Sequence, residues 1–257
     1  MRRICDIFLS LCCIVILSLS CKTVYQPQSV SYKDYRLTPA AKQSDAVNQL
    51  LQPYSDSVNK SMNDVVAVAA LELVKSQPEG TLGNVLADAV LIKARESYKT
   101  SIDAAFVNHG GIRLNAIPAG NITRGKIFEL SPFDNIIVLL KLKGKLFQEF
   151  LNHISGRGGW PAAGVQWQIK NLPAGQAGKK AINVLINGQP IDDNATYTIA
   201  VADYVANGGD DCVMLKKVPQ INNGYLFRDA VLDYMTDINK QGKKIAATIE
   251  NRVTNAE

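Results

Sequence analysis

The chain has 257 residues, of which 47% are hydrophobic, and this is ample apolar material for one large domain or two small ones. The formal net charge of +5 is modest, and Lys and Arg are spread along the sequence instead of clustering into a basic stripe. Composition therefore argues against a nucleic-acid partner and indicates no more than a mild attraction to anions.

Residues 1–20 are predicted to be a signal peptide. Met1-Arg2-Arg3 supplies a basic start, and Ile7 to Leu19 is an apolar run too short for a membrane span. Ser18-Leu19-Ser20 precedes Cys21, which resembles a bacterial lipobox, although Ser18 stands where a Leu is usual. We expect lipidation of Cys21 to anchor the chain in the bacterial cell envelope, on the periplasmic or outer-membrane face. Plain signal cleavage and an uncleaved anchor are the alternatives.

Cysteine usage agrees with this interpretation. Cys5, Cys12 and Cys13 leave with the signal peptide and Cys21 carries lipid, so Cys212 has no disulfide partner. Cys212 is expected to be a small buried hydrophobic residue, because the sequence offers no activating partner for a catalytic thiol.

Residues 21–44 are predicted to be a lipidated linker, since Pro27, Pro39 and several Ser and Gln residues leave no periodicity. The folded domain is expected over residues 45–257. Its first helix should begin near Ala46, and Val65 to Leu73 is an apolar, strand-like run.

A helix is predicted to follow Thr81, which is suited to the N-cap position. Leu82, Val85, Leu86, Ala89 and Val90 share one face of this helix. Asp88 lies among these apolar residues, and we expect it to be a carboxylate on the helix surface.

A predicted strand, Ile102 to Val107, runs into paired glycines at Asn108-His109-Gly110-Gly111-Ile112-Arg113. Glycine tolerates positive φ and allows a ligand to approach the backbone closely. Asn108 offers an amide, and Arg113 offers a planar donor fork suited to carboxylate or phosphate. A hairpin turn with a surface Arg is the alternative.

The second half of the chain alternates between strands and helices without a strict βαβ rhythm. Pro132 fixes a loop with Phe133 at its tip, and Tyr204 to Asp211 forms a second glycine loop. The predicted fold class is therefore α+β, a layered mixed domain of sheets and helices. The expected strands are Ile136 to Leu142, the segment after Trp160 up to Ile169, Val184 to Ile186 and Tyr197 to Ala202, and the expected helices are Lys145 to Ile154 and Leu226 to Tyr234.

Four ordered stretches, covering roughly Val65 to Tyr234, resemble the C-terminal, substrate-recognition domain of the 5′-nucleotidase / UDP-sugar hydrolase family. This resemblance implies a layered α+β domain of the 5′-nucleotidase C-terminal type, with its nucleoside site on loops. The stretches are Leu82-Gly83-Asn84 with Asp88-Ala89, Asn108 to Arg113, Pro132-Phe133-Asp134-Asn135, and Tyr204 with Asn207-Gly208-Gly209-Asp210.

The resemblance implies that Phe133 and Tyr204 sandwich the base, where stacking is worth about 1–3 kcal/mol per base. Tyr204 stands where better-known members carry Phe, a change that should preserve stacking. Asp210 matches a carboxylate that accepts hydrogen bonds from ribose hydroxyls. For Phe133 the alternative is a core aromatic, which is the usual fate of a Phe.

Further substrate-binding residues are implied in the same way. Gly159 and Trp160 match a Gly–aromatic pair near the site, and Asn108, Arg113 and Asn135 match polar ligands around the base, sugar or phosphate. One departure concerns phosphate binding, because well-known members place an Arg before the Gly-Asn helix start, where this chain has only Lys75. A Lys can supply a point charge there but no donor fork.

Complete family members also carry an N-terminal metallophosphoesterase domain, whose two metals activate water and clamp phosphoryl oxygens. This sequence has two histidines, no Asp-x-His pair, no Gly-Asn-His-Glu stretch and no room before Ala46 for such a domain. We therefore expect no catalytic or metal-binding residue and no cofactor in this chain, and a divalent metal pair in a separate partner chain. His109 is a candidate general acid, or else occupies a position where the family tolerates glycine and serves no chemistry.

The expected function is thus nucleoside or nucleotide recognition for a hydrolase of nucleotide catabolism that is catalytically incomplete without a separate metallophosphoesterase chain. The alternative is a non-catalytic surface lipoprotein that binds nucleosides or nucleotides. A scaffold with no ligand is a third possibility, and binding measurements separate it from the other two.

Overall fold

The computed structural model describes residues 29, 31–34, 38, 44–173 and 178–256. The predicted signal peptide, Cys21 and most of the predicted linker lie outside the described residues. The chain divides into two compact units, Met1–Leu50 and Leu51–Glu257. Helix α2 (Asp45–Met62), which the sequence predicted from about Ala46, crosses this division and has no buried residue. Among the helices that the structure describes, none is long and apolar enough to cross a bilayer.

A five-stranded mixed sheet lies at the centre of the second unit, with the strand order β12-β6-β11-β3-β7. Two of its strands, β11 and β3, run parallel, and the other pairs are antiparallel. The strands are β3 (Ala104–Phe106), β6 (Ile136–Lys143), β7 (Ala162–Ala163), β11 (Thr196–Ala202) and β12 (Gln220–Leu226).

The other strands that the structure describes form smaller sheets. A four-stranded sheet has the order β10-β9-β8-β13, in which β13 pairs with β8 in parallel. Two antiparallel pairs, β1 with β5 and β2 with β4, divide the predicted Val65 to Leu73 run between them. The strands are β1 (Val65–Ala69), β2 (Leu73–Val74), β4 (Ala116–Ile117), β5 (Gly120–Thr123), β8 (Val165–Asn171), β9 (Lys179–Ile186), β10 (Gln189–Pro190) and β13 (Val253–Asn255).

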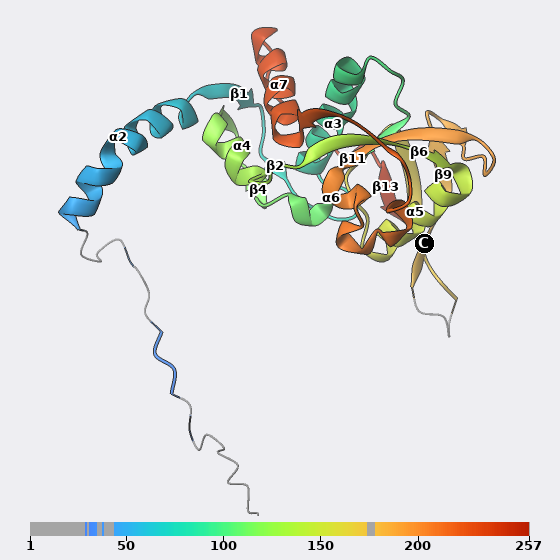
Figure 1. Ribbon diagram of the computed structural model, residues 1–257. Coiled ribbons are helices and arrows are strands. Elements are labelled where there is room, and N and C mark those ends of the chain that lie inside the picture. Colours follow the sequence, from blue (N-terminus) through green and yellow to red (C-terminus); the bar gives the residue numbers. More distant parts are fainter. Residues whose placement is uncertain (1–28, 30, 35–37, 39–43, 174–177, 257) are drawn as a thin grey trace, which may run out of the picture. The chain divides into compact units, whose positions relative to one another are not determined.

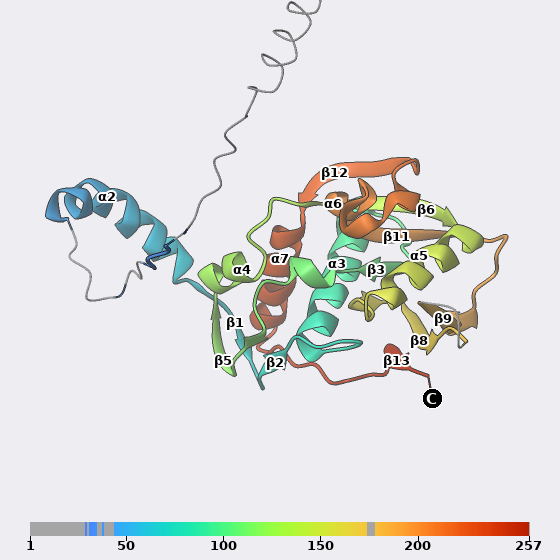
Figure 2. The ribbon, with the colours of Figure 1, turned by 90° about the horizontal axis from the view of Figure 1, so that it is seen from below.

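Helices cover both faces of the five-stranded sheet, because the strands alternate apolar side chains between two cores. Ile137 and Leu139 of β6 face α3 (Thr81–Tyr98) and α7 (Phe227–Lys240), which pack side by side (Figures 1 and 2). Val138, Leu140 and Leu142 enter the second core, where α5 (Gly144–Gly156) packs between this sheet and the four-stranded sheet. The predicted α+β layered class is confirmed.

Aromatic side chains fill the second core. Phe106 of β3 meets Phe147 and Phe150 of α5 edge-on, with ring centroids 5.8 and 5.1 Å apart. Trp160 is buried against Phe150, and the buried Trp167 donates from Nε1 to Ser155 Oγ at 3.0 Å. These contacts fix the end of α5 against the sheet, next to the loops that form the site described below.

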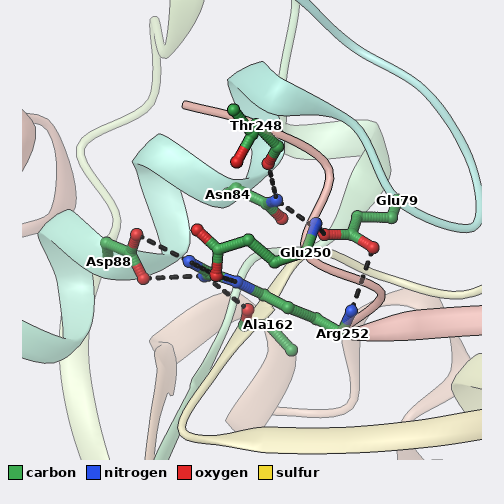
Figure 3. Close-up of polar contacts among 7 residues, drawn as sticks. All are labelled: Glu79, Asn84, Asp88, Ala162, Thr248, Glu250 and Arg252. Atoms are coloured by element: carbon green, nitrogen blue, oxygen red, sulfur yellow. Dashed lines mark hydrogen bonds and ion pairs between the residues drawn. The ribbon is translucent and has the colours of Figure 1, made fainter. Parts of the chain in front are cut away.

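Two predictions about α3 are wrong. Thr81 is the first residue of the helix, with Gly80 at the N-cap, and Thr81 Oγ1 accepts a hydrogen bond from Val74 N at 2.8 Å. Asp88 is not a plain surface carboxylate, because its two oxygens accept from Arg252 Nη1 and Nη2 at 2.7 and 2.9 Å (Figure 3). Arg252 comes from the C-terminal segment, which the local pattern around Asp88 could not show.

The C-terminal segment is held on α3 by the network that Figure 3 shows. The buried Glu79 accepts from the backbone nitrogens of Glu250 and Arg252, both at 2.9 Å, and from Asn84 Nδ2 at 2.7 Å. Asn84 also donates to Thr248 O, at 3.0 Å. Each buried polar group of the network therefore has a partner, as the low dielectric of an interior requires.

Candidate functional site

The site lies at one end of the central strands of the five-stranded sheet. β11 runs parallel to β3 and antiparallel to β6, so the carboxyl ends of β3 and β11 lie beside the amino end of β6. Asn108 follows β3, Tyr204 follows β11 in the short helix α6 (Asp203–Ala206), and Asn135 immediately precedes β6. The sheet thus brings together three loops that are far apart in the sequence.

These loops enclose a cleft of about 280 Å³. Every substrate-binding residue predicted from the sequence lines the cleft, apart from the pair Gly159 and Trp160. The lining residues are Asn108, Gly110, Gly111, Arg113, Phe133, Asn135, Tyr204 and Asp210. The paired glycines belong to a 3₁₀ helix, His109–Gly111, in place of a hairpin turn, and Arg113 beyond this bend reaches the cleft.

Gly159 is not among the residues that line the cleft. Its neighbour Trp160 is buried in the second core, and Gly159 packs beside it with φ +90°. A Cβ at this position would lie 3.1 Å from methyl carbons of Ile169 and Val253, and Gly159 O accepts from Gln77 Nε2 at 2.7 Å. The structure thus gives Gly159 a packing role, and the burial of Trp160 is the physical reason.

Both predicted stacking residues are surface aromatics. Phe133 is 39% exposed and Tyr204 is 46% exposed, which excludes the alternative of a core position for Phe133. The Arg113 guanidinium carbon lies 5.6 Å from the centroid of the Phe133 ring, within cation–π range. The Tyr204 ring lies directly on Gly209, where a Cβ would approach ring atoms to 2.4 Å, so a larger residue there would displace the ring.

The Phe133 loop is held by the start of α7. Arg228 Nη2 donates to Asp134 Oδ1 at 2.6 Å, and the Arg228 guanidinium carbon lies 4.1 Å from the centroid of the Phe128 ring. Phe227 N donates to Asn135 O at 2.8 Å. The sequence pattern predicted the helix but not the role of Arg228, because nothing local to residue 228 indicates a contact with residue 134.

Asp210 is bound from three directions. Its Oδ2 accepts from Asn108 Nδ2 at 3.0 Å, and its Oδ1 accepts from Tyr204 Oη at 3.2 Å. The Asp210 backbone N–H donates to Tyr204 Oη at 3.2 Å, and Asp210 O lies 2.8 Å from His153 Nε2, at the end of α5. No local pattern around residue 153 indicates this role of His153, since α5 and this loop meet only in the folded chain.

Two positively charged side chains, Lys75 and Arg113, lie close to the 3₁₀ helix His109–Gly111. Lys75 Nζ donates to Ile112 O at 2.8 Å, and burial together with the nearby charge of Arg113 lowers the pKa of Lys75. Burial and the charge of Lys75 lower the pKa of His109, so its imidazole is neutral at neutral pH. His109 is not among the residues lining the cleft. An anionic ligand group near Lys75 and Arg113 would relieve their mutual repulsion.

Cys212 is fully buried next to this site, with a free thiol. Burial first, and then the charge of Asp210, raises the pKa of the Cys212 thiol to about 12. The thiol is therefore protonated at neutral pH and is a poor nucleophile. The predicted burial of Cys212 as a small hydrophobic residue is confirmed.

The donor groups of the described residues do not form a metal centre. In residues 44–173 and 178–256, as in the few described residues before them, no three or more His, Cys, Asp and Glu side chains gather in a way that could hold an ion. Of the two histidines, His153 Nε2 is engaged by the Asp210 carbonyl and His109 lies beside the cationic Lys75. These residues do not fit a two-metal centre.

Comparison with known proteins identifies relatives of this chain. Residues 60–217 match the family model described as 5′-nucleotidase, C-terminal domain. UshA of Yersinia enterocolitica is 29% identical over 148 residues, which cover 57% of this chain and 26% of UshA. The trifunctional nucleotide phosphoesterase YfkN of Bacillus subtilis is 30% identical over 231 residues, covering 84% of this chain and 15% of YfkN.

A solved structure shares the fold. The 5′-nucleotidase precursor from Thermus thermophilus superposes with a TM-score of 0.71 at 29% identity, over 82% of this chain and 43% of that protein. This chain thus spans less than half the length of each of these three relatives. The family match includes every residue that lines the cleft, and the chain belongs to the 5′-nucleotidase C-terminal domain family.

Proposed function

We propose that this chain recognises the nucleoside or nucleotide for a 5′-nucleotidase-type phosphohydrolase of nucleotide catabolism, whose metals lie in a separate metallophosphoesterase chain. The observation that carries this proposal is the cleft itself. Two exposed aromatic rings, a carboxylate, two amides and an Arg line a space of about 280 Å³. A small apolar cleft with a few convergent polar groups is the usual form of a small-molecule site.

Each part of a nucleotide has a complementary group in the cleft. A base stacks between Phe133 and Tyr204, because aromatic faces bind any base through its π-face. Asp210 accepts from the ribose hydroxyls, and the amides of Asn108 and Asn135 supply further hydrogen bonds. The phosphate lies toward Arg113, with Lys75 as a second positive charge.

The chemical step belongs to the partner in this proposal. Paired divalent metals would activate water and stabilise the charge on the phosphoryl oxygens. The described residues of this chain lack a donor set for them, so its own side chains bind and orient the substrate. The Arg113 fork fixes the phosphate, and the aromatic pair keeps the base from rotating.

Calorimetric titration of adenosine and AMP tests the proposed recognition. Phe133→Ala or Tyr204→Ala should weaken binding by roughly ten- to a hundredfold, since a lost stacking face costs about 1–3 kcal/mol. Asp210→Asn should weaken binding less than Asp210→Ala, because the amide retains an acceptor. Tyr54→Ala, which removes an exposed aromatic of α2, is the matched control and should leave binding unchanged. Equal binding by wild type and both cleft variants would show that these aromatics do not hold the ligand.

The purified protein alone, with added Mn²⁺, Zn²⁺ or Mg²⁺, should not hydrolyse AMP above a control without protein. The reason is the lack of a metal donor set in the described residues. Phosphate release is the measurement. Turnover that follows the protein through purification and disappears in Arg113→Ala would contradict the proposal that a separate chain carries out the chemical step.

Nucleoside binding without a catalytic partner in the cell would favour the alternative function, that of a non-catalytic surface lipoprotein.

We place the protein in the bacterial cell envelope, anchored through a lipid on Cys21. The support is the basic start, the apolar run and the small residue before Cys21. Labelling of cells with a clickable fatty acid should mark wild type. Cys21→Ser should abolish the label and should either release the exported protein from membranes or leave it with an uncleaved signal. A wild-type protein that takes up no label would remove Cys21 as a lipid site.

A further inference from the structure

The loop that carries Asp210 has a strained backbone, and side chains at the end of α5 bind it at two points. Asp210 and Asp211 are consecutive non-glycine residues in the left-handed region, with φ of 50° and 58°. Such conformations cost energy and persist only where the surrounding structure enforces them. Here His153 binds the Asp210 carbonyl, and Arg157 forms an ion pair with Asp211.

The Asp210 carboxylate is also held, and it keeps capacity for a ligand. Asn108 donates to one oxygen at 3.0 Å and Tyr204 Oη donates to the other at 3.2 Å. A carboxylate has about four lone-pair sites, so each oxygen retains one acceptor. Two acceptors on one rigid carboxylate match two adjacent hydroxyl donors, whereas a ligand with a single hydroxyl uses only one of them.

The Tyr204 hydroxyl is the group that joins this carboxylate to the stacking surface. It donates to Asp210 Oδ1 and accepts from the Asp210 backbone N–H, while its ring rests on Gly209. The ring face and the acceptor pair therefore have a fixed relative position. A phenylalanine would keep the ring but would leave the carboxylate held by Asn108 alone, so that it could turn about χ2.

We infer that the Tyr204 hydroxyl is a specificity-determining positioning group, which holds Asp210 so that the cleft prefers nucleosides with a vicinal 2′,3′-diol over 2′-deoxynucleosides. This inference rests on the proposed function, because it concerns the same cleft. The Tyr204 hydroxyl contacts the Asp210 carboxylate and would influence the choice of sugar through that carboxylate, without touching the ribose.

Titration of adenosine and 2′-deoxyadenosine into the full chain and its Tyr204→Phe variant tests the inference. Wild type should bind adenosine more tightly, and Tyr204→Phe should reduce that preference by about tenfold, the usual size of one hydrogen bond to a charged group. Affinity of the variant for 2′-deoxyadenosine should change by less than about threefold, because stacking is kept. A general loosening of the fold would weaken both ligands equally and would leave the ratio unchanged.

Tyr225→Phe is the matched control, since it also removes a tyrosine hydroxyl bonded to an aspartate, Asp233, at 2.6 Å, away from the cleft. It should leave both affinities and their ratio at the wild-type values. If wild type binds both nucleosides and Tyr204→Phe retains the full preference for adenosine, the inference is wrong while the proposed function stands. If wild type binds neither nucleoside, the proposed function fails and the inference falls with it.

Discussion

Gly164→Ala is expected to lower the free energy of unfolding by about 2–5 kcal/mol. Gly164 lies between β7 and β8, where the chain passes from the five-stranded to the four-stranded sheet. Its φ is +79°, and a Cβ would lie 2.1 Å from Asp103 O, just before β3. The left-handed conformation costs an L-residue about 1–2 kcal/mol. Forcing packed backbone apart adds about 1–3 kcal/mol.

Gly188→Ala separates these two contributions. Gly188 has almost the same φ, +78°, but a Cβ there would meet no atom within 4 Å. This control should therefore cost only the conformational part, about 1–2 kcal/mol. Urea denaturation of both variants at one temperature gives the comparison. Equal losses for Gly164→Ala and Gly188→Ala would show that the chain relaxes around the added methyl group, and that the contact with Asp103 does not restrict this crossing.

Arg252→Met is expected to lower the free energy of unfolding by about 3 kcal/mol. Removing one partner of a buried ion pair leaves the other charge uncompensated and typically costs about 3–5 kcal/mol. Arg252 is buried and binds both oxygens of Asp88 and Ala162 O, the latter at 3.1 Å. The Asp88 side chain is 31% exposed, so water compensates part of the loss, and we expect the lower end of the range.

Lys126→Met is the matched control for Arg252→Met. Lys126 and Glu129 form an ion pair of 2.6 Å, but both side chains are more than a third exposed. Losing this pair should cost less than about 1 kcal/mol. Adding Asp88→Leu to Arg252→Met should restore part of the lost stability, since it removes the unpaired carboxylate. A loss for Arg252→Met no greater than that for Lys126→Met would mean that the network in Figure 3 contributes little to stability.

Much of the site could be predicted from the sequence, because its groups follow local signals. Asn108 follows the end of an apolar strand and is close to two glycines, and Tyr204 follows the end of another strand, after Asp203. Phe133 follows a proline on a loop. Strand patterns, glycine pairs and Pro loops depend on near neighbours in the chain, so one sequence was enough to place Asn108 at a strand end and Phe133 and Tyr204 on loops. The resemblance to a known family supplied their expected roles.

By itself, then, the sequence determined the α+β class and the loop positions of Asn108, Phe133 and Tyr204. The resemblance to a known family supplied the substrate-binding residues, all of which line the cleft except Gly159 and its neighbour Trp160. Only the tertiary structure decided that Gly159 packs in the interior, that Arg228 holds the Phe133 loop and that His153 and Tyr204 hold Asp210. It also decided the pairing of Asp88 with Arg252, which are separated by 164 residues. Contacts across such separations depend on which elements pack together, and no periodicity or turn signal within a short window encodes that packing.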